Sequence, residues 1–292
     1  MPGYLAASLR GALRRRFPAA YPLLIQSIYS PASALDGLRE ENFHNRRILR
    51  QGTLECNCCG KQGKPIYLFL PIVQFDRMGV SPLRDNIICA HCRSSQRTRS
   101  LLQAVRTVAT ESTGMDSVIL DLDDSWSAGS VIAQLGQRQA TTYDVGRPWG
   151  SIDEVGVRNE DIAGLTFEDG IFDIVVSAEV HEHVEDTWKA FAEVHRVLKP
   201  GGTYVFTVPC RSSFATTQRL AFGTEFGPLW TGFRHIHGDP RESGGIAAYW
   251  LFGMDLVERL REIGLEAVVS QVMPPGSPRV PVDVFIASKQ PE

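Results

Sequence analysis

The pattern of apolar and polar residues predicts an alternation of buried strands and amphipathic helices. Residues 172–177 read FDIVVS and residues 203–209 read TYVFTVP, two short apolar runs rich in β-branched side chains. Such runs suit strands that are buried on both faces of a parallel sheet. Between the runs, apolar residues recur at helical spacing, namely Val184, Trp188, Phe191, Val194 and Leu198. We therefore predict a strand–helix–strand unit with a site at the carboxyl ends of its strands.

The same pattern predicts further elements on both sides of this unit. The central helix should stop near Lys199, because Pro200 cannot continue a helix and Gly201 accepts left-handed dihedrals. Additional strands are expected at 117–123, 140–145, 266–272 and 281–288, and the last two should pair as a hairpin. Additional helices are expected at 4–17, 93–109, 128–136 and 254–263. The chain is therefore predicted to be an α/β protein.

Composition narrows the class of protein without naming a function. The 292 residues are 43% hydrophobic and 22% charged, which is ordinary for a globular protein with a sizeable core. A formal charge of −3 gives no reason to expect a nucleic-acid partner. No apolar run approaches the roughly 20 residues that cross a bilayer, so we expect no transmembrane segment and a cytoplasmic protein. The sequence makes no prediction about oligomeric state.

Four cysteines in two pairs predict a structural zinc site. Cys56 and Cys59 form one C-x-x-C turn, and Cys89 and Cys92 form a second. Each turn points two sulfur atoms at one ion, and two turns complete a tetrahedral four-thiolate shell with no open position. Cys58 is a candidate substitute ligand. The alternatives are free buried thiols or a redox pair, although five cysteines within one short stretch favour a metal site in a reducing compartment.

Residues 161–209 carry a resemblance to a known family. They read DIAGLTFEDGIFDIVVSAEVHEHVEDTWKAFAEVHRVLKPGGTYVFTVP. This stretch resembles the later core motifs of the class I S-adenosylmethionine-dependent methyltransferases, in the branch that carries "FD-V-S-VLEH" and "R-LKPGG". The resemblance extends over roughly residues 118–288. It implies a Rossmann-like, seven-stranded, mostly parallel sheet with helices on both faces, preceded here by the zinc-binding module.

The resemblance also implies a binding site for S-adenosyl-L-methionine. Asp121 holds the position of an acid that usually precedes a glycine-rich loop, but the loop here reads DDSWSAG and lacks G-x-G. Asp144 would accept both ribose hydroxyls, with a turn-capping aspartate as the alternative, and Asp161 would contact the adenine. Arg97 would bind a carboxylate unless it lies on a solvent-facing helix surface. The full expected set is Asp121, Leu122, Asp123, Tyr143, Asp144, Val145, Asp161, Ile162, Ser177, Ala178, Glu179 and Arg97.

Histidines supply the candidate general bases, because imidazole titrates near neutrality. His183 and His237 are the first candidates, with His181 and Asp239 behind them. His181 stands where the resembled family usually has leucine. The H-x-H spacing of His181 and His183, together with that of His235 and His237, also raises the idea of a metal-binding cluster. The alternative is separate histidines, one at the site and the others capping or exposed.

These observations predict three parts and one favoured function. Residues 1–50 form an N-terminal helical segment, which either packs as a solvated helix or meets a partner or membrane surface. Residues 51–96 form a zinc-knuckle module, and residues 97–292 form a methyltransferase domain with a lid insertion at about 210–250. The expected reaction is methyl transfer to an oxygen or nitrogen of a small-molecule or sugar-type acceptor. The alternatives are a non-catalytic binding or assembly protein on a degenerate scaffold, and a metal-dependent enzyme that uses the histidine pairs.

Overall fold

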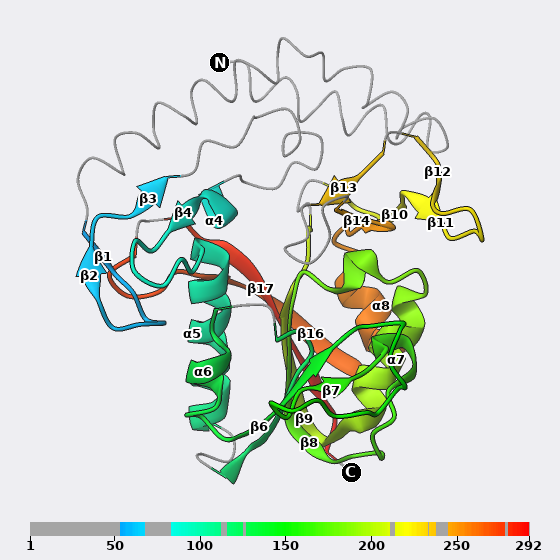
Figure 1. Cartoon of the computed structure of the whole chain (residues 1–292), viewed down its shortest axis with the longest axis horizontal. Coiled ribbons are helices and arrows are strands. Elements are labelled where there is room, and N and C mark those ends of the chain that lie inside the picture. Colours follow the sequence, from blue (N-terminus) through cyan, green and yellow to red (C-terminus); the bar gives the residue numbers. More distant parts are fainter. Residues whose placement is uncertain are drawn as a thin grey trace. The chain divides into compact units, whose positions relative to one another are not determined.

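A seven-stranded sheet forms the centre of the chain (Figure 1). The computed structural model describes residues 53–67, 83–111, 116–124, 127–210, 214–232, 234–237, 245–277 and 280–291, so the expected N-terminal helical segment lies outside it. The strand order is β16-β17-β9-β8-β5-β6-β7. The strands are β5 (Val118–Asp121), β6 (Gln137–Thr142), β7 (Arg158–Asn159), β8 (Phe172–Ala178), β9 (Leu198–Thr207), β16 (Leu265–Val272) and β17 (Val282–Lys289).

Strand direction follows the prediction. The five strands β5 to β9 pair with parallel neighbours, and β17 pairs antiparallel with both β9 and β16. The expected seven-stranded, mostly parallel, Rossmann-like sheet is therefore confirmed, as is the final hairpin. The carboxyl ends of the parallel strands meet at one edge of the sheet, where binding residues of such folds gather.

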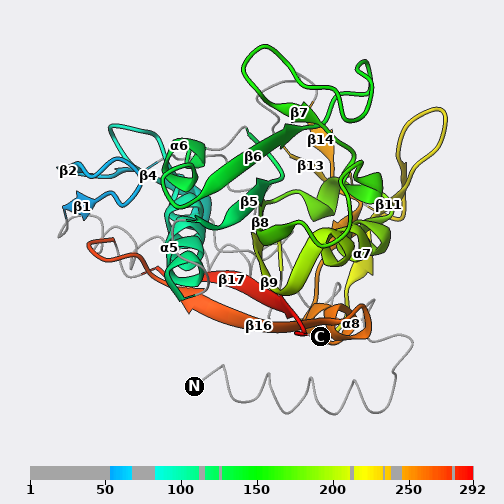
Figure 2. The same ribbon diagram turned by 90° about the horizontal axis from the view of Figure 1, so that it is seen from below.

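Helices cover both faces of the sheet, as Figure 2 shows. α5 (Gln96–Glu111) and α6 (Gly129–Ile132) lie on one face, and α7 (Thr187–Val197) and α8 (Leu256–Glu262) lie on the other. Each pair fills its own apolar core, one that includes Leu101 and Val105 of α5 and another that includes Phe191 and Val194 of α7. Burial of these two apolar layers fixes the helices against the sheet.

Several predicted boundaries differ from the structure, and the largest differences are at β9 and α6. Lys199–Gly202 is part of β9 rather than a loop, because Leu198 already pairs with Phe172 and the register shifts before Ile174 pairs with Thr203. The helix predicted at 128–136 is a single turn, since the backbone of Gln137 must donate to Ser117 O at 2.8 Å to enter β6.

The cysteine-rich module lies in the same compact unit as the sheet, a unit that begins at Thr53. Its elements are β1 (Leu54–Glu55), β2 (Gln62–Gly63), β3 (Ile66–Tyr67), α4 (Leu83–Asn86) and β4 (Ile87–Ile88). β1 pairs with β2, and β3 pairs with β4. The backbone of Glu55 also donates to Gly276 O in the turn after β16, at 3.1 Å. The module is thereby hydrogen-bonded to the final hairpin.

The segment between β9 and α8 contains three short antiparallel pairs. β10 (Gln218–Arg219) pairs with β15 (Trp250–Leu251), β11 (Ala221–Phe222) with β12 (Leu229–Trp230), and β13 (Ile236–His237) with β14 (Ile246–Ala247). We call residues 210–250 the insertion. Over the residues that the structure describes, no helix has the length and apolar character of a membrane span.

Candidate functional site

Three of the predicted cofactor-binding carboxylates lie at the ends of adjacent parallel strands. Asp121 is the last residue of β5, Asp144 follows the end of β6 by two residues, and Asp161 follows the end of β7 by two residues. Because β5, β6 and β7 are consecutive in the sheet, these residues share one sheet edge. Asp144 is exposed, Asp161 is half-buried and Asp121 is fully buried.

The loop after β6 is held by one buried amide. Asn159 Oδ1 accepts from the backbone of Asp144 at 2.8 Å, and Asn159 Nδ2 donates to Asp144 O at 2.9 Å. The Asp144 carboxylate accepts from Gly146 N, which is the turn-capping role considered above. Tyr143 and Val145, the neighbouring residues of the predicted set, are 56% and 78% exposed. This loop therefore presents polar and apolar groups together at the edge of the sheet.

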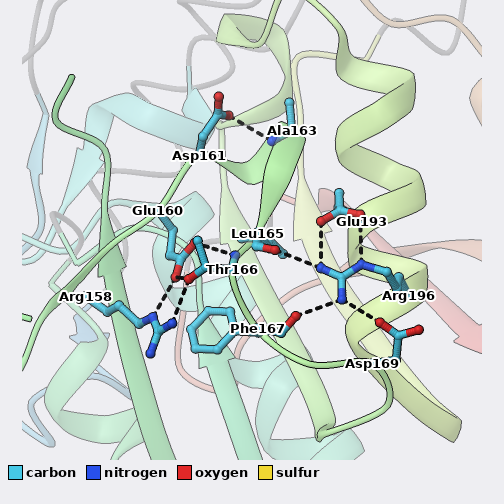
Figure 3. A network of polar contacts seen from close by, with 10 residues as sticks. All are labelled: Arg158, Glu160, Asp161, Ala163, Leu165, Thr166, Phe167, Asp169, Glu193 and Arg196. Atoms are coloured by element: carbon cyan, nitrogen blue, oxygen red, sulfur yellow. Dashed lines mark hydrogen bonds and ion pairs between the residues drawn. The ribbon is translucent and has the colours of Figure 1, made fainter. Parts of the chain in front are cut away.

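A polar network fixes the segment that carries Asp161 and Ile162 (Figure 3). The Asp161 carboxylate accepts from Ala163 N at 2.9 Å and caps the short helix η2 (Ile162–Gly164), in which Ile162 is buried. On one side, Arg158 binds Glu160, whose carboxylate also accepts from Thr166.

On the other side of this segment, one arginine of α7 holds the backbone. Arg196 donates to the carbonyl oxygens of Leu165 and Phe167 at 2.9 and 2.7 Å, and to the carboxylates of Asp169 and Glu193 (Figure 3). Its guanidinium thus connects the loop before β8 to the helix after it. The sequence pattern gave no indication of this role, because an arginine in the last turn of a helix is common without partners.

Asp121 is engaged within the protein. Its Oδ2 accepts from Nε and Nη2 of Arg138, a residue of β6, at 2.8 and 2.7 Å. Arg138 also contacts Asp124 in the loop that replaces the glycine-rich one. These carboxylates raise the pKa of Arg138, although burial alone would lower it. A cofactor that reaches Asp121 would meet a carboxylate that is already neutralised.

The end of β8 is strained at one residue. Glu179 has a φ of +57°, a left-handed conformation that is uncommon for residues other than glycine. The two preceding members of the predicted set, Ser177 and Ala178, are buried, and the Ser177 hydroxyl contacts the hydroxyl of Tyr204 within the sheet. Leu122, at the end of β5, is likewise buried, and Asp123 is half-buried. The side chains of Ser177, Ala178 and Leu122 are therefore buried in the protein rather than exposed at the sheet edge.

His181 lies in the core. Its ring stacks on Phe191 with centroids 3.7 Å apart, and its nitrogens contact Tyr204 Oη at 2.8 Å and Thr187 Oγ1 at 3.1 Å. Burial lowers the pKa of His181 to about 3, so the ring is neutral at physiological pH. We therefore leave His181 out of the candidate bases. Asp239, another candidate, lies outside the described residues.

His183 and His237 come together from distant parts of the chain. Their ring centroids are 4.9 Å apart, and a fully buried carboxylate, Glu182, lies between their nitrogens. Glu182 Oε1 is 3.6 Å from His183 Nε2 and 3.8 Å from His237 Nδ1. Burial and the nearby Glu179 raise the pKa of Glu182, and burial together with His183 lowers the pKa of His237 to about 4. We call Glu182, His183 and His237 the imidazole–carboxylate cluster.

Two arginines, the buried Arg84 and the half-buried Arg97, border this cluster. Arg84, in α4, pairs with the Glu179 carboxylate and with Asp85, and Arg97 pairs with Asp85 at 2.6 Å. Arg97, predicted to bind a cofactor or substrate carboxylate, therefore already has one within the protein. When Glu182 is ionised, the carboxylates of Glu179, Glu182 and Asp85 and the guanidinium groups of Arg84 and Arg97 leave one net negative charge. No sequence motif marks Arg84 or Asp85, and Glu182, although it is the acid of the resembled "VLEH" motif, was not among the predicted site residues.

The four paired cysteines converge on one point. The Sγ atoms of Cys56, Cys59, Cys89 and Cys92 all lie within 4.8 Å of one another, and all four thiols are free. Cys56 Sγ is 3.6 Å from Cys92 Sγ, and Cys59 Sγ is 3.8 Å from Cys89 Sγ. Sulfur atoms around a tetrahedral zinc with bonds of about 2.3 Å lie about 3.8 Å apart. The cluster is therefore compatible with zinc, and Cys58 is not part of it.

Comparisons with known proteins match part of the central sheet to a methyltransferase family. Residues 130–206 match a family model described as a methyltransferase domain. A Mycolicibacterium smegmatis protein, described as a probable S-adenosylmethionine-dependent methyltransferase, is 36% identical over 61 residues. That match covers 21% of this chain and 24% of the relative, so it spans about a quarter of that protein.

Two solved structures are similar to this chain at low sequence identity. The Burkholderia thailandensis 1,6-didemethyltoxoflavin-N1-methyltransferase is 16% identical, with a TM-score of 0.39 over 67% of this chain and 80% of that one. An S-adenosylmethionine-dependent methyltransferase from Mesorhizobium loti is 18% identical, with a TM-score of 0.42 over 65% of this chain and 98% of that one. The matched family segment, residues 130–206, runs from α6 to β9 of the central sheet. Over residues 130–206, this chain thus matches the methyltransferase-domain family, and the relative that it matches over 61 residues is described as S-adenosylmethionine-dependent.

Proposed function

We propose that this protein transfers a methyl group from S-adenosyl-L-methionine to an oxygen or nitrogen of a small-molecule or sugar-type acceptor. The observation that carries the proposal is the family match over residues 130–206, combined with acidic residues at the ends of β6 and β7. The sulfonium is a good leaving group, so the protein contributes mainly positioning and the exclusion of water.

The proposed cofactor contacts are distributed over neighbouring loops. Asp144 would accept the ribose hydroxyls, with Tyr143 and Val145 beside it, and the segment of Asp161 and Ile162 would hold the adenine. The Asn159 and Arg196 hydrogen bonds support this assignment, because they fix both loops before any ligand arrives. Asp121 acts through its ion pair with Arg138 in this scheme.

Calorimetric titration of the full chain with S-adenosyl-L-methionine tests the proposal. Asp144→Asn keeps an oxygen that can accept from Gly146 N but removes the anionic partner of the ribose. We expect affinity to fall by about tenfold or more, as for the loss of a charge-assisted hydrogen bond. Asp153→Asn is the matched control, because Asp153 also caps a turn, through Val155 N and Val157 N, outside the proposed contacts. Absence of binding at millimolar ligand would favour the non-catalytic alternative.

The acceptor class is tested with methyl-labelled cofactor. The protein is incubated with a cell extract that has been separated into small-molecule, nucleic-acid and protein fractions. Label in the small-molecule fraction alone is the expected result. Label recovered in nucleic acid or protein would refute the proposed acceptor class while leaving methyl transfer intact.

We further propose a structural zinc ion on Cys56, Cys59, Cys89 and Cys92. The sulfur spacing supports it, and a four-thiolate shell leaves no position for a substrate. The ion would order a module whose apolar cluster consists of Leu54 and the cysteines themselves. Mass spectrometry of metals should find one equivalent of zinc that Cys59→Ser releases and Cys58→Ser retains. Equal zinc content in both variants would refute this assignment.

A further inference from the structure

We propose that Glu182, His183 and His237 bind a second metal ion, a divalent transition-metal cation, at the carboxyl end of β8. One carboxylate and two imidazoles are a donor set that suits zinc, iron or manganese and leaves coordination positions open. The existence of this site does not depend on the cysteine cluster or on methyl transfer. Its role in the reaction, given below, rests on the proposed function.

The hydrogen bonds of His183 aim its second nitrogen at the carboxylate. His183 Nδ1 donates to the carbonyl oxygen of Ala247 at 2.8 Å, so in the neutral ring Nε2 carries the lone pair. That lone pair faces Glu182 Oε1 at 3.6 Å, a distance too long for a hydrogen bond. Two electron-rich atoms that face each other in a buried place repel unless a proton or a cation lies between them, and a bound cation would satisfy both.

The Glu182 carboxylate supplies the independent evidence for a ligand. Its side chain is fully buried, and neither oxygen has a hydrogen-bond partner among the described residues. A buried charge without a partner is costly, so such groups are normally paired or bound to metal. Atoms bound at about 2.1 Å to one cation lie roughly 3.0–3.4 Å apart, so small inward side-chain rotations would close the site.

The net charge around the cluster is compatible with a bound divalent cation. Arg84 and Arg97 form ion pairs with Glu179 and Asp85 rather than with Glu182. The single net negative charge of this buried group becomes a single net positive charge when a divalent cation binds.

The insertion delivers the third ligand, and its backbone is fixed against the first two. Tyr249 N donates to Glu182 O at 2.6 Å, and Trp250 Nε1 donates to Val184 O at 3.0 Å. His237 belongs to β13, which pairs with β14, the strand that contains Ala247. A cation bound here would therefore connect the insertion to the end of β8.

For the proposed methyl transfer, the cation would bind an acceptor hydroxyl. The bound hydroxyl releases its proton to water, and its oxygen forms the bond to the methyl carbon. The carbon–sulfur bond breaks, and neutral S-adenosylhomocysteine leaves. The positive charge of the sulfonium is balanced by the released proton. This step narrows the acceptor class to hydroxyl compounds and assigns His183 and His237 to the metal rather than to general-base catalysis.

Titration with Co²⁺ tests the site in the full chain with zinc on the cysteine cluster. We expect one Co²⁺ per chain, with ligand-field absorption but without the sulfur-to-cobalt charge-transfer bands of a thiolate site. His183→Gln, His237→Gln and Glu182→Gln should each weaken Co²⁺ binding at least tenfold. His195→Gln is the matched control, because His195 lies on α7 outside the cluster. This variant should bind Co²⁺ with the affinity of the wild type. Zinc retained on the cysteines reports that each variant is folded.

The outcomes separate this proposal from the proposed function. Co²⁺ binding that is unchanged in folded His183→Gln and His237→Gln, or no Co²⁺ bound at all, overturns the site even if the cofactor still binds. Loss of cofactor binding with Co²⁺ binding intact overturns the proposed function alone. Catechol serves as a hydroxyl probe of the open positions, and a shift of the cobalt bands is expected. Unchanged bands would refute the hydroxyl-binding role and confine the cation to a structural one.

Discussion

At the scale of single residues, charged side chains hold the loops at the sheet edge. Arg138 neutralises Asp121, Arg84 pairs with Glu179, and Arg196 binds two carbonyl oxygens together with Glu193 and Asp169. Each guanidinium gathers groups from separate elements, which its planar fork of donors permits. The segment that carries Asp161 therefore depends on Arg196, which itself touches no proposed ligand.

Arg196→Lys should destabilise the protein by about 1–3 kcal/mol. The lysine keeps the charge but cannot reach two carbonyl oxygens and two carboxylates at once, so backbone acceptors of the loop before β8 lose partners. Urea unfolding measures the loss.

Arg261→Lys is the control for this substitution. Arg261 makes a single exposed ion pair with Glu266, so its replacement should cost no more than about 0.5 kcal/mol. Equal losses in the two variants would show that Arg196 does not organise the loop.

Sequence patterns predicted individual residues unevenly. The four cysteines of the cluster were predicted with their spacing, because C-x-x-C turns carry their geometry locally. The histidine pairs predicted part of the cluster. His183 and His237 come together as candidates at one site, whereas His181 packs in the core. Glu182 was not selected, since its isolation from polar partners arises only when α4, η3 (His181–His183) and the insertion come together.

At the scale of elements, the β13–β14 pair determines whether His237 can reach Glu182. The pair is two residues long in each strand, and its second strand follows Gly245. Gly245 has a φ of +70°, and a Cβ there would lie 2.3 Å from His237 O. A residue other than glycine would therefore be strained and would also push against the backbone that carries the proposed ligand.

Gly245→Ala should weaken Co²⁺ binding at the imidazole–carboxylate cluster at least tenfold while the cysteine cluster keeps its zinc. Cobalt titration and metal analysis of the same sample measure both sites. Gly232→Ala, also in the insertion, should bind Co²⁺ normally, because a Cβ there meets nothing within 4 Å. Normal cobalt affinity in Gly245→Ala would mean that the hairpin does not position His237.

The central strands β5, β8 and β9 were predicted because their apolar runs are continuous and both faces are buried, whereas the two-residue β7 was not predicted. Strand order and the reversed β17 were expected from the family resemblance rather than from periodicity. The strands of the insertion were not predicted, since each has two residues and no periodic pattern can form over that length. The extension of β9 back to Leu198 was missed because Pro200 and Gly201 read as a turn.

At the scale of the whole molecule, hydrogen bonds connect the cysteine module and the helix that follows it to the far edge of the sheet. Glu55 N donates to Gly276 O, Gln96 Nε2 donates to Val280 O, and Ser100 Oγ donates to Val272 O. All three acceptors lie at the end of β16 or in the turn before β17. Ordering of the module should therefore stabilise this end of the final hairpin.

Loss of the proposed zinc should increase amide hydrogen exchange around Val272, Gly276 and Val280 as well as in the module. The reason is that the Glu55 donor is held by β1, next to Cys56. Exchange mass spectrometry of Cys59→Ser, compared with Cys58→Ser, measures the effect. β8 and β9 in the centre of the sheet should stay protected in both. Exchange confined to residues 54–92 would show that the module is energetically independent.

The position of β17 has a consequence for how the chain acquires its fold during synthesis. This strand is the last of the seven to be made, yet it lies between β9 and β16. A ribosome-bound chain that has emerged only through residue 272 has an outer strand with no partner and leaves the β9 edge open. Both vacancies are filled by the same eight residues, Val282–Lys289. The far side of the sheet should therefore form in a single late event, and until then the nascent chain exposes an unpaired edge that chaperones would be expected to shield.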